Sequence, residues 1–311
     1  VYKDYIWGGD RIVRKYRRPV PPGIYAESWE VSTRPEGMSV VAGGPHAGRT
    51  LDDLVRAWGP ALLGTRPAAG RFPLLIKLID SRERLSVQVH PDDDAAARHG
   101  GEAKTEMWYV LEAAPGAAVF AGLKPGVTRR AFEQAIRETR LENVLRTVPV
   151  EAGEAIFMPG GRVHALDAGC LILEVQQNSN TTYRIYDWGR VGHDGRPRET
   201  HLAEALRVIR WGDDGSSKAV SVPLPAEAPN ARPLIVECPY FRMERLELRA
   251  PWRPAPDAGT FQAYFAAKDA LRLEWTGGRM SVPEGGTVLV PAAIEVSAAP
   301  QGAAACALRV T

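Results

Sequence analysis

The chain has 311 residues, of which 45% are hydrophobic and 24% are charged, values typical of a globular protein with one large domain or two smaller ones. Its 39 basic and 37 acidic residues leave a net charge of +2, which argues against the broad basic face that nucleic-acid binding requires. No run approaches the roughly 20 apolar residues of a membrane span, and the first residues lack a secretion signal, so we expect a cytoplasmic protein without membrane contact.

The cysteines are odd in number and far apart in the sequence. Cys170, Cys238 and Cys306 show no C-x-x-C spacing, so neither a disulfide framework nor a thiolate zinc site is indicated. We expect neutral, mostly buried thiols, which fit a reducing compartment.

Glycine and proline punctuate short apolar runs along the whole chain, a pattern that predicts many short strands and a mainly β fold. Two stretches depart from it. Residues 50–63 open with Thr50 ahead of two aspartates, a helix start signal. Residues 128–145, within an insertion at about 126–147, carry apolar residues at helical spacing, for example Phe132 and Ile136. We expect both as helical insertions on a β scaffold.

Two alternating segments follow the first of these helices. In residues 85–93 the alternation places Ser86, Gln88 and His90 on one face of a strand. A second alternating run begins near residue 104 and puts Lys104 and Glu106 on the same side. The two runs therefore predict a hairpin-like pair of strands with polar groups on one face.

Further along, the sequence echoes itself. Residues 150–159 and 282–291 each contain a glycine six residues ahead of a proline, which predicts a turn feeding a short strand in two related β domains. Five residues beyond the proline lies His164 in the first copy and Val296 in the second. With a linker expected at 217–232, we predict one domain over 1–225 and a second over 226–311.

The polar residues of the first domain form a mixed nitrogen and oxygen set that suits zinc or a similar divalent ion and leaves room for substrate or water. The set is Gln88, His90, Glu106 and His164. Its spacing resembles the two motifs of the cupins, H-x-H with a downstream Glu and G(x5)P-x-G-x-x-H. That resemblance implies two jelly-roll β-barrel domains, a metal-binding one over 1–225 and a degenerate one over 226–311, which has Val296 in place of the last histidine and no metal site.

A closer resemblance rests on Gln88, which stands where cupins have the first histidine of H-x-H. Together with longer motifs, it makes the chain similar to the short bacterial form of the type I phosphomannose isomerases. The motifs are Trp7-Gly8-Gly9, Glu27 to Glu30, Leu85 to Asp93, Lys104 to Tyr109, and Glu174 to Trp188. The resemblance implies an enzyme with one Zn²⁺ per chain that interconverts D-mannose 6-phosphate and D-fructose 6-phosphate through an enediol.

The same resemblance implies roles for individual residues. Gln88, His90, Glu106 and His164 would be the metal ligands, and Arg184 would lie beside the reacting sugar carbons. For the catalytic base, Lys104, Glu174 and a metal-bound water stay open as alternatives. The phosphate would be held by Arg184, Lys77 and Ser86. Lys77 sits in an apolar run, where a charge needs a partner, and a bound anion would supply one.

Some positions depart from the family pattern, and some histidines stay outside it. Asn180 stands where an Asp is usual, which removes a negative charge near Arg184 in the sequence, and Ala26 stands where a Gly is frequent. We expect the remaining histidines not to bind metal: His46, His99, His193 and His201.

Two rival functions remain at this stage. A cupin oxygenase could use the two His and one Glu with iron, although Gln88 and the basic residues argue against it. A non-catalytic sugar-phosphate-binding cupin would keep the fold and metal without turnover. We expect a small-molecule sugar phosphate as the partner and a monomer or weak homodimer.

Overall fold

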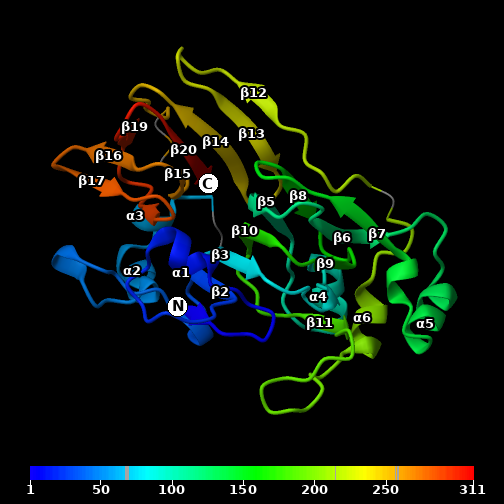
Figure 1. Cartoon of the computed structure of the whole chain (residues 1–311). Helices are drawn as coiled ribbons and strands as arrows, with labels where there is room; N and C mark the ends of the chain where they lie inside the picture. The colour runs from blue at the N-terminus through cyan, green and yellow to red at the C-terminus, as the bar shows by residue number, and fades with distance from the viewer. Residues whose placement is uncertain (67–69, 214, 256, 258) are drawn as a thin grey trace. The chain divides into compact units, whose positions relative to one another are not determined.

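Strands dominate the computed structural model, which describes residues 1–66, 70–213, 215–255, 257 and 259–311 (Figure 1). The predicted mainly β fold is confirmed. The chain forms two compact units, one from residues 2–28 and 76–219 and the other from residues 1, 29–75 and 220–311. Among the described helices, none has the length and apolar character to cross a bilayer.

The unit containing residues 76–219 is built on two antiparallel sheets. One has the order β1(Tyr2–Lys3), β2(Glu27–Val31), β3(Leu74–Ser81), β10(Cys170–Gln177), β5(Glu106–Ala113), β8(Ala155–Met158). The other has the order β11(Tyr183–Tyr186), β4(Val87–Val89), β9(His164–Leu166), β6(Ala118–Leu123), β7(Leu145–Pro149). Alternate side chains of the two sheets face each other, which is the arrangement of a jelly-roll barrel.

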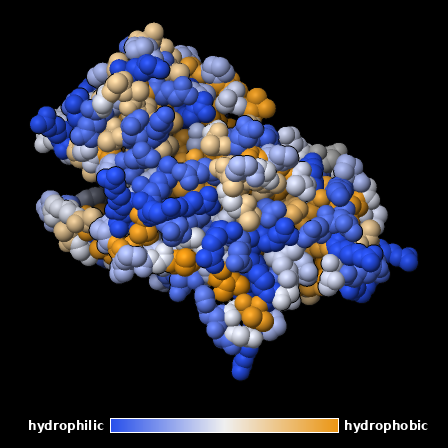
Figure 2. Space-filling model, viewed as in Figure 1, coloured by the Kyte–Doolittle hydropathy of each residue, from blue (hydrophilic) through white to orange (hydrophobic). Residues whose placement is uncertain are grey.

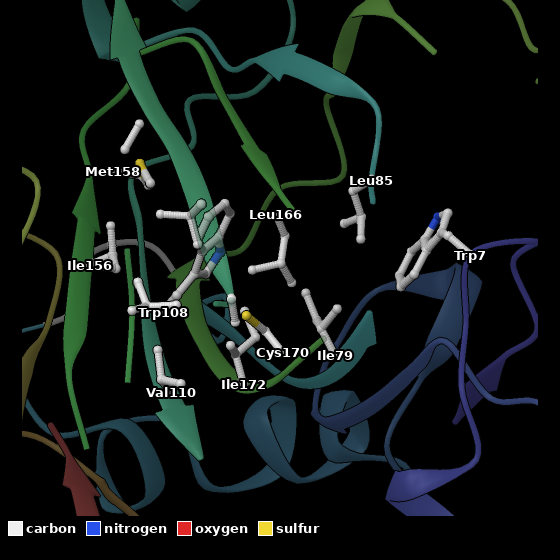
Figure 3. Close-up of a cluster of buried hydrophobic side chains, with 14 of the residues drawn as sticks. Trp7, Ile79, Leu85, Trp108, Val110, Ile156, Met158, Leu166, Cys170 and Ile172 are labelled. Carbon is white, nitrogen blue, oxygen red and sulfur yellow. The ribbon is translucent and has the colours of Figure 1, made fainter. Parts of the chain in front are cut away.

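A hydrophobic core fills the space between these sheets. Trp108 of β5 lies at its centre, between Ile156 of β8 and Leu166 of β9 (Figure 3). Trp108 is 1% exposed, and Ile156 and Leu166 are fully buried. Because side chains alternate along a strand, burying Trp108 turns Glu106 to the same interior face.

The other unit repeats this design. Its sheets have the orders β12(Val222–Leu224), β13(Arg232–Glu237), β14(Arg242–Leu248), β20(Ala305–Val310), β15(Gln262–Lys268), β18(Thr287–Val290) and β17(Gly278–Val282), β16(Leu271–Trp275), β19(Val296–Pro300). Gly153 (φ 91°) precedes β8 and Gly285 (φ 78°) precedes β18, two left-handed positions that favour glycine. The predicted internal repeat is confirmed. The expected linker at 217–232 contains the short strand β12.

The compact units divide the chain differently from the predicted domains 1–225 and 226–311. The junction at 219/220 is close to the expected one, but residues 29–75 group with the C-terminal segment. The backbone of Phe261 donates to Leu63 (3.2 Å) and that of Ala292 to Leu62 (2.9 Å). The rings of Phe72 and Phe261 are 4.6 Å apart. These contacts form between segments far apart in sequence, which local pattern does not reveal.

Both predicted helical insertions are present, in shortened form. The first is split at Gly59 into α2(Leu51–Trp58) and α3(Pro60–Leu63), and Thr50 caps α2 through a capping box with Asp53. In the second, α5(Arg129–Arg137) is capped by Thr128 and ends well before residue 145. The chain turns at Thr139 (φ 53°) and continues as a 3₁₀ turn and then β7. The other helical elements are α1(Arg11–Tyr16), η1(Pro35–Gly37), η2(Gly44–His46), α4(Asp93–His99), η3(Leu141–Asn143) and α6(Leu202–Val208).

The three cysteines are free thiols, as the sequence predicts. Cys170, Cys238 and Cys306 are free, and burial raises the pKa of Cys170 and Cys306 to about 11, which keeps both protonated at neutral pH. On the face shown in Figure 2, apolar residues are scattered among hydrophilic ones. Scattered apolar residues are normal for a protein surface.

Candidate functional site

The four predicted metal ligands converge on the interior of the first barrel. Gln88 of β4 is the strand partner of His164 of β9, and their side-chain Nε2 atoms are 3.3 Å apart. His90 follows β4, and Glu106 begins β5 in the opposing sheet. The ligand atoms of His90, Glu106 and His164 all lie within 4.8 Å of one another.

The geometry of these side chains fits a metal ion. Nε2 of His90 is 3.6 Å from Oε2 of Glu106, and Nε2 of His164 is 3.3 Å from Oε1. Each residue is at most 1% exposed. Nε2 of His90 has no hydrogen-bond partner among the residues that the structure describes. A buried polar atom without a partner is costly, and a bound cation would remove that cost.

The outer nitrogens of both imidazoles are fixed by backbone carbonyls. Nδ1 of His90 lies 2.8 Å from the carbonyl of Thr181, and Nδ1 of His164 lies 2.8 Å from that of Arg162. A carbonyl only accepts, so each Nδ1 carries the proton and each Nε2 lone pair faces the cluster. Burial lowers the pKa of His164 to about 4 and that of His90 well below its ordinary value. Both rings are therefore neutral at pH 7, the form that binds metals.

Lys104 and Glu106 act as a pair. Burial raises the pKa of Glu106 to about 7, although the charge of Lys104 opposes this shift. Nζ of Lys104 is 2.8 Å from Oε2 of Glu106. Lys104 precedes β5 and does not lie in it, so the predicted strand begins two residues later than its alternation suggests. The backbone N–H of Lys104 donates to Pro91 (2.9 Å) and holds the lysine at the cluster.

Lys77 and Glu174 form a second buried ion pair beside the cluster. Nζ of Lys77 is 3.1 Å from Oε1 of Glu174 and 3.8 Å from Oε2 of Glu27. Trp108 donates to Oε2 of Glu174 (3.0 Å). Burial by itself would raise the pKa of Glu174, but Lys77, Lys104 and the Trp108 hydrogen bond outweigh it and lower the pKa to about 2. The partner that Lys77 requires is thus supplied by the protein's own carboxylates.

Ser86 and Arg184 lie along the other sheet. Ser86 is 4% exposed and lies just ahead of β4, two residues before Gln88 in the sequence. Arg184 of β11 is the strand partner of Gln88, and its Nη1 donates to the carbonyl of Glu199 (2.7 Å). Nε of Arg184 is buried without a hydrogen-bond partner among the described residues. All nine predicted site residues belong to the unit formed by residues 2–28 and 76–219.

Sequence reasoning missed several supporting residues. Trp108 shares a face with Glu106, so its spacing of two was the available signal. Glu27 belongs to the Glu-Ser-Trp-Glu motif, but no local pattern pairs it with Lys77. Thr181 acts through its backbone, which carries no sequence signal. The pKa of Tyr5 is raised, chiefly by burial and then by Glu27.

The departures from the family pattern lie outside the cluster. Asn180 is exposed, and its backbone N–H donates to Glu102 (3.1 Å). The charged groups that act on Arg184 come from elsewhere, with Arg198 foremost. Of the chain's histidines, the described metal cluster contains two, His90 and His164.

Known proteins resemble this chain in sequence and in fold. The family model for the catalytic domain of type I phosphomannose isomerase matches residues 1–122. The mannose-6-phosphate isomerase of Streptococcus mutans is 35% identical over 244 residues, which cover 78% of this chain and 75% of that protein. The chain belongs to the mannose-6-phosphate isomerase family.

Solved structures of the family extend the match to the whole chain. The mannose 6-phosphate isomerase of Bacillus subtilis superposes with a TM-score of 0.90 and 29% identity, covering 100% of this chain and 96% of that one. A mannose 6-phosphate isomerase bound with zinc and yttrium shares the fold, with a TM-score of 0.74, 15% identity and coverage of 100% and 97%. The isomerase interpretation is therefore supported over the oxygenase and binding-protein alternatives.

Proposed function

We propose that this chain interconverts D-mannose 6-phosphate and D-fructose 6-phosphate with one zinc ion per chain. His90, Glu106 and His164 would hold the ion, with the side-chain amide of Gln88 beside them. The observation that carries the proposal is the set of three buried ligand atoms within 4.8 Å of one another in a member of this family. Two neutral imidazoles and a carboxylate are a donor set that zinc favours in catalytic sites.

The reaction moves a proton between C2 and C1 through an enediol, so it requires a base and stabilisation of negative charge on oxygen. A bound zinc ion would supply Lewis-acid polarisation of the substrate oxygens. The chain's own residues supply the rest. Burial of the cluster excludes water, which strengthens each electrostatic contact that the substrate makes there.

Of the two candidate side chains for the base, Lys104 and Glu174, we propose that Lys104 moves the proton; a metal-bound water is the third alternative. Glu174 is held ionised with a pKa of about 2, and its oxygens face Lys77 and Trp108. A carboxylate stabilised in this way accepts a proton poorly. Its role is then to hold Lys77 and to orient Trp108. Lys104 faces the cluster directly, 2.8 Å from Glu106.

For the phosphate and the reacting sugar, we propose that Arg184 makes the direct contact. It faces the same side as Gln88, and its Nε is available. A guanidinium donates well to phosphate and to developing oxyanions. Ser86 would add a hydroxyl donor on that face. Lys77 would contribute positive charge through its pair with Glu174.

The test is a coupled isomerase assay on mannose 6-phosphate with protein as purified, after chelation, and after zinc is restored. We expect activity to disappear on chelation and to return with zinc. Glu106→Gln should lose metal and activity, whereas Glu112→Gln, a partly exposed carboxylate on the same strand that pairs with Lys15, should keep both. Zinc-loaded protein without turnover would refute the isomerase, and iron with oxygen consumption would point to an oxygenase.

The cysteines and the location of the site residues bear on the cellular compartment and on the oligomeric state. Three free cysteines fit a reducing compartment, so we place the enzyme in the cytoplasm. We propose a monomer or weak homodimer, because all the proposed site residues come from one unit of a single chain. Sedimentation over a range of protein concentrations would distinguish the two.

A further inference from the structure

Residues 199–201 run along the outer edge of β11 and hold Arg184 at three points. The carbonyl of Glu199 accepts from Nη1 of Arg184 (2.7 Å). The backbone N–H of His201 donates to the carbonyl of Arg184 (2.7 Å). The backbone N–H of Arg184 in turn lies 3.2 Å from Nδ1 of the His201 ring. The imidazole therefore closes a reciprocal pair with the backbone of Arg184.

We propose that His201 is a positioning residue, which fixes the backbone and guanidinium of Arg184 for contact with the sugar phosphate. The proposal rests on the function proposed above in one respect, that Arg184 touches the substrate. His201 itself lies outside the metal cluster. It acts only through Arg184.

The hydrogen bond defines the state of the ring. A peptide N–H can only donate, so Nδ1 of His201 must accept, and the proton of the neutral ring is on Nε2. Nε2 is 3.9 Å from Oε2 of Glu199, beyond hydrogen-bond distance. The essential feature of His201 is thus one acceptor at the Nδ1 position.

Helix α6 supports this arrangement by packing against β11. It begins directly after His201, whose carbonyl accepts the backbone N–H of Ala205 (2.9 Å). Ala205 and Val208 pack in one buried cluster with Ile185. Ile185 lies at a register shift in β11 and packs with Val87 and Val89 of β4, whose side chains alternate with that of Gln88 and face the other way. The packing of α6 on that face sets where residues 199–201 meet Arg184.

Fixing the guanidinium has a direct consequence for binding. One donor is engaged by Glu199, and Nε of Arg184 has no hydrogen-bond partner in the described part of the chain. Residues 199–201 therefore select one orientation of the group and leave Nε for a ligand. If the imidazole is lost, the backbone N–H of Arg184 loses its acceptor. Residues 199–201 are then held less firmly against β11, and so is the carbonyl of Glu199 that accepts from the guanidinium. Small misplacements of a contact group cost up to about 100-fold in rate.

Three substitutions separate this role from simple packing. In His201→Asn the amide oxygen can reach the Nδ1 position, whereas in His201→Gln the longer side chain reaches the Nε2 position, and His201→Leu has no acceptor. We expect kcat/KM for mannose 6-phosphate to stay within about threefold of wild type for Asn and to fall about tenfold or more for Gln and Leu. Metal content should be unchanged, and His99→Leu, an exposed histidine, is the matched control.

A second measurement does not depend on turnover. Hydrogen exchange at the Arg184 amide should remain slow in wild type and His201→Asn, and should accelerate in His201→Gln and His201→Leu.

A double substitution tests whether His201 acts through Arg184. In an Arg184→Lys background, His201→Leu should cost little further activity, because its effect passes through the arginine. Equal behaviour of the Asn and Gln variants in exchange and in kcat/KM would overturn the proposal. An inactive wild type with the expected exchange pattern would refute the isomerase function alone.

Discussion

At the scale of single residues, Glu106 shows how burial prepares a side chain for a cation. It is fully buried, and burial raises its pKa to about 7 in the absence of metal, against the pull of Lys104. A raised pKa means that the protonated carboxyl is the favoured form below pH 7. A metal ion must displace that proton, so protons and metal compete for this group.

Metal affinity should therefore depend on pH in a defined window. We expect the apparent affinity for zinc to fall by up to about tenfold per pH unit below pH 7 and to level off above it. His164, with a pKa of about 4, adds proton competition only near that pH. Titration against a competing chelator between pH 5.5 and 8 measures this. An affinity that does not change across pH 6 to 7.5 would contradict it.

Lys104 and Glu174 should separate in a pair of substitutions. Lys104→Met should lower kcat by about 100-fold or more, because a proton-transfer group is removed. Glu174→Gln should mainly lower the free energy of unfolding, by about 3 kcal/mol, because Lys77 loses its nearer carboxylate in a buried setting. Steady-state kinetics and denaturant unfolding on the zinc-loaded variants give the two readouts. An inactive Glu174→Gln of wild-type stability, alongside an active Lys104→Met, would reverse the assignment.

At the scale of elements, the second barrel shows what happens to the same positions without a metal. Gln262 of β15 pairs with Val290 as Glu106 of β5 pairs with Met158, and Val296 begins β19 where His164 begins β9. The oxygen of Gln262 accepts from Nε of Arg309 (2.8 Å) and from the hydroxyl of Tyr264 (2.7 Å). Arg309 occupies the place of Glu174, opposite the aromatic residue of the neighbouring strand. The equivalent positions satisfy one another, so no cation is needed.

This network should contribute to stability and not to activity. Nη1 of Arg309 is 3.4 Å from Oε2 of Glu244, with 9% and 3% of their side chains exposed. Arg309→Met leaves that buried carboxylate with fewer partners and should lower the free energy of unfolding by about 3 kcal/mol. Arg272→Met removes an exposed pair with Glu274 in the same unit and should cost less than about 1 kcal/mol. Urea unfolding compares the two, and a loss of metal content in Arg309→Met would contradict the structural role.

At the scale of the whole molecule, metal binding concerns one of the two compact units. All proposed ligands lie in the unit of residues 2–28 and 76–219. Zinc added to metal-free protein should slow hydrogen exchange in residues 87–90, 104–108 and 162–166. Exchange in 242–248, 262–268 and 305–310 should change little. Mass spectrometry of the exchanged peptides resolves these segments, and uniform protection along the chain would contradict an independent second barrel.

The sequence by itself determined the mainly β fold and the repeat of two barrels, and it predicted the three residues His90, Glu106 and His164 whose side chains the structure brings within 4.8 Å of one another. These follow from local signals: alternation places Gln88 and His90 on one face, and the glycine and proline spacing marks equivalent turns. Helix ends were less well determined: the split at Gly59 and the turn at Thr139 (φ 53°) both fall inside ranges that were predicted as continuous helix. No local sequence pattern predicted that residues 29–75 group with the C-terminal segment.

Only the tertiary structure decided which charges meet. Lys77 carries the same sequence signal whether its partner is a bound phosphate or a carboxylate, and the fold supplies Glu174 and Glu27. The tautomers of the metal-cluster histidines and the restraint of Arg184 by His201 depend on backbone carbonyls and N–H groups. Backbone groups are the same for every residue type, so their positions become specific only when distant segments are packed together.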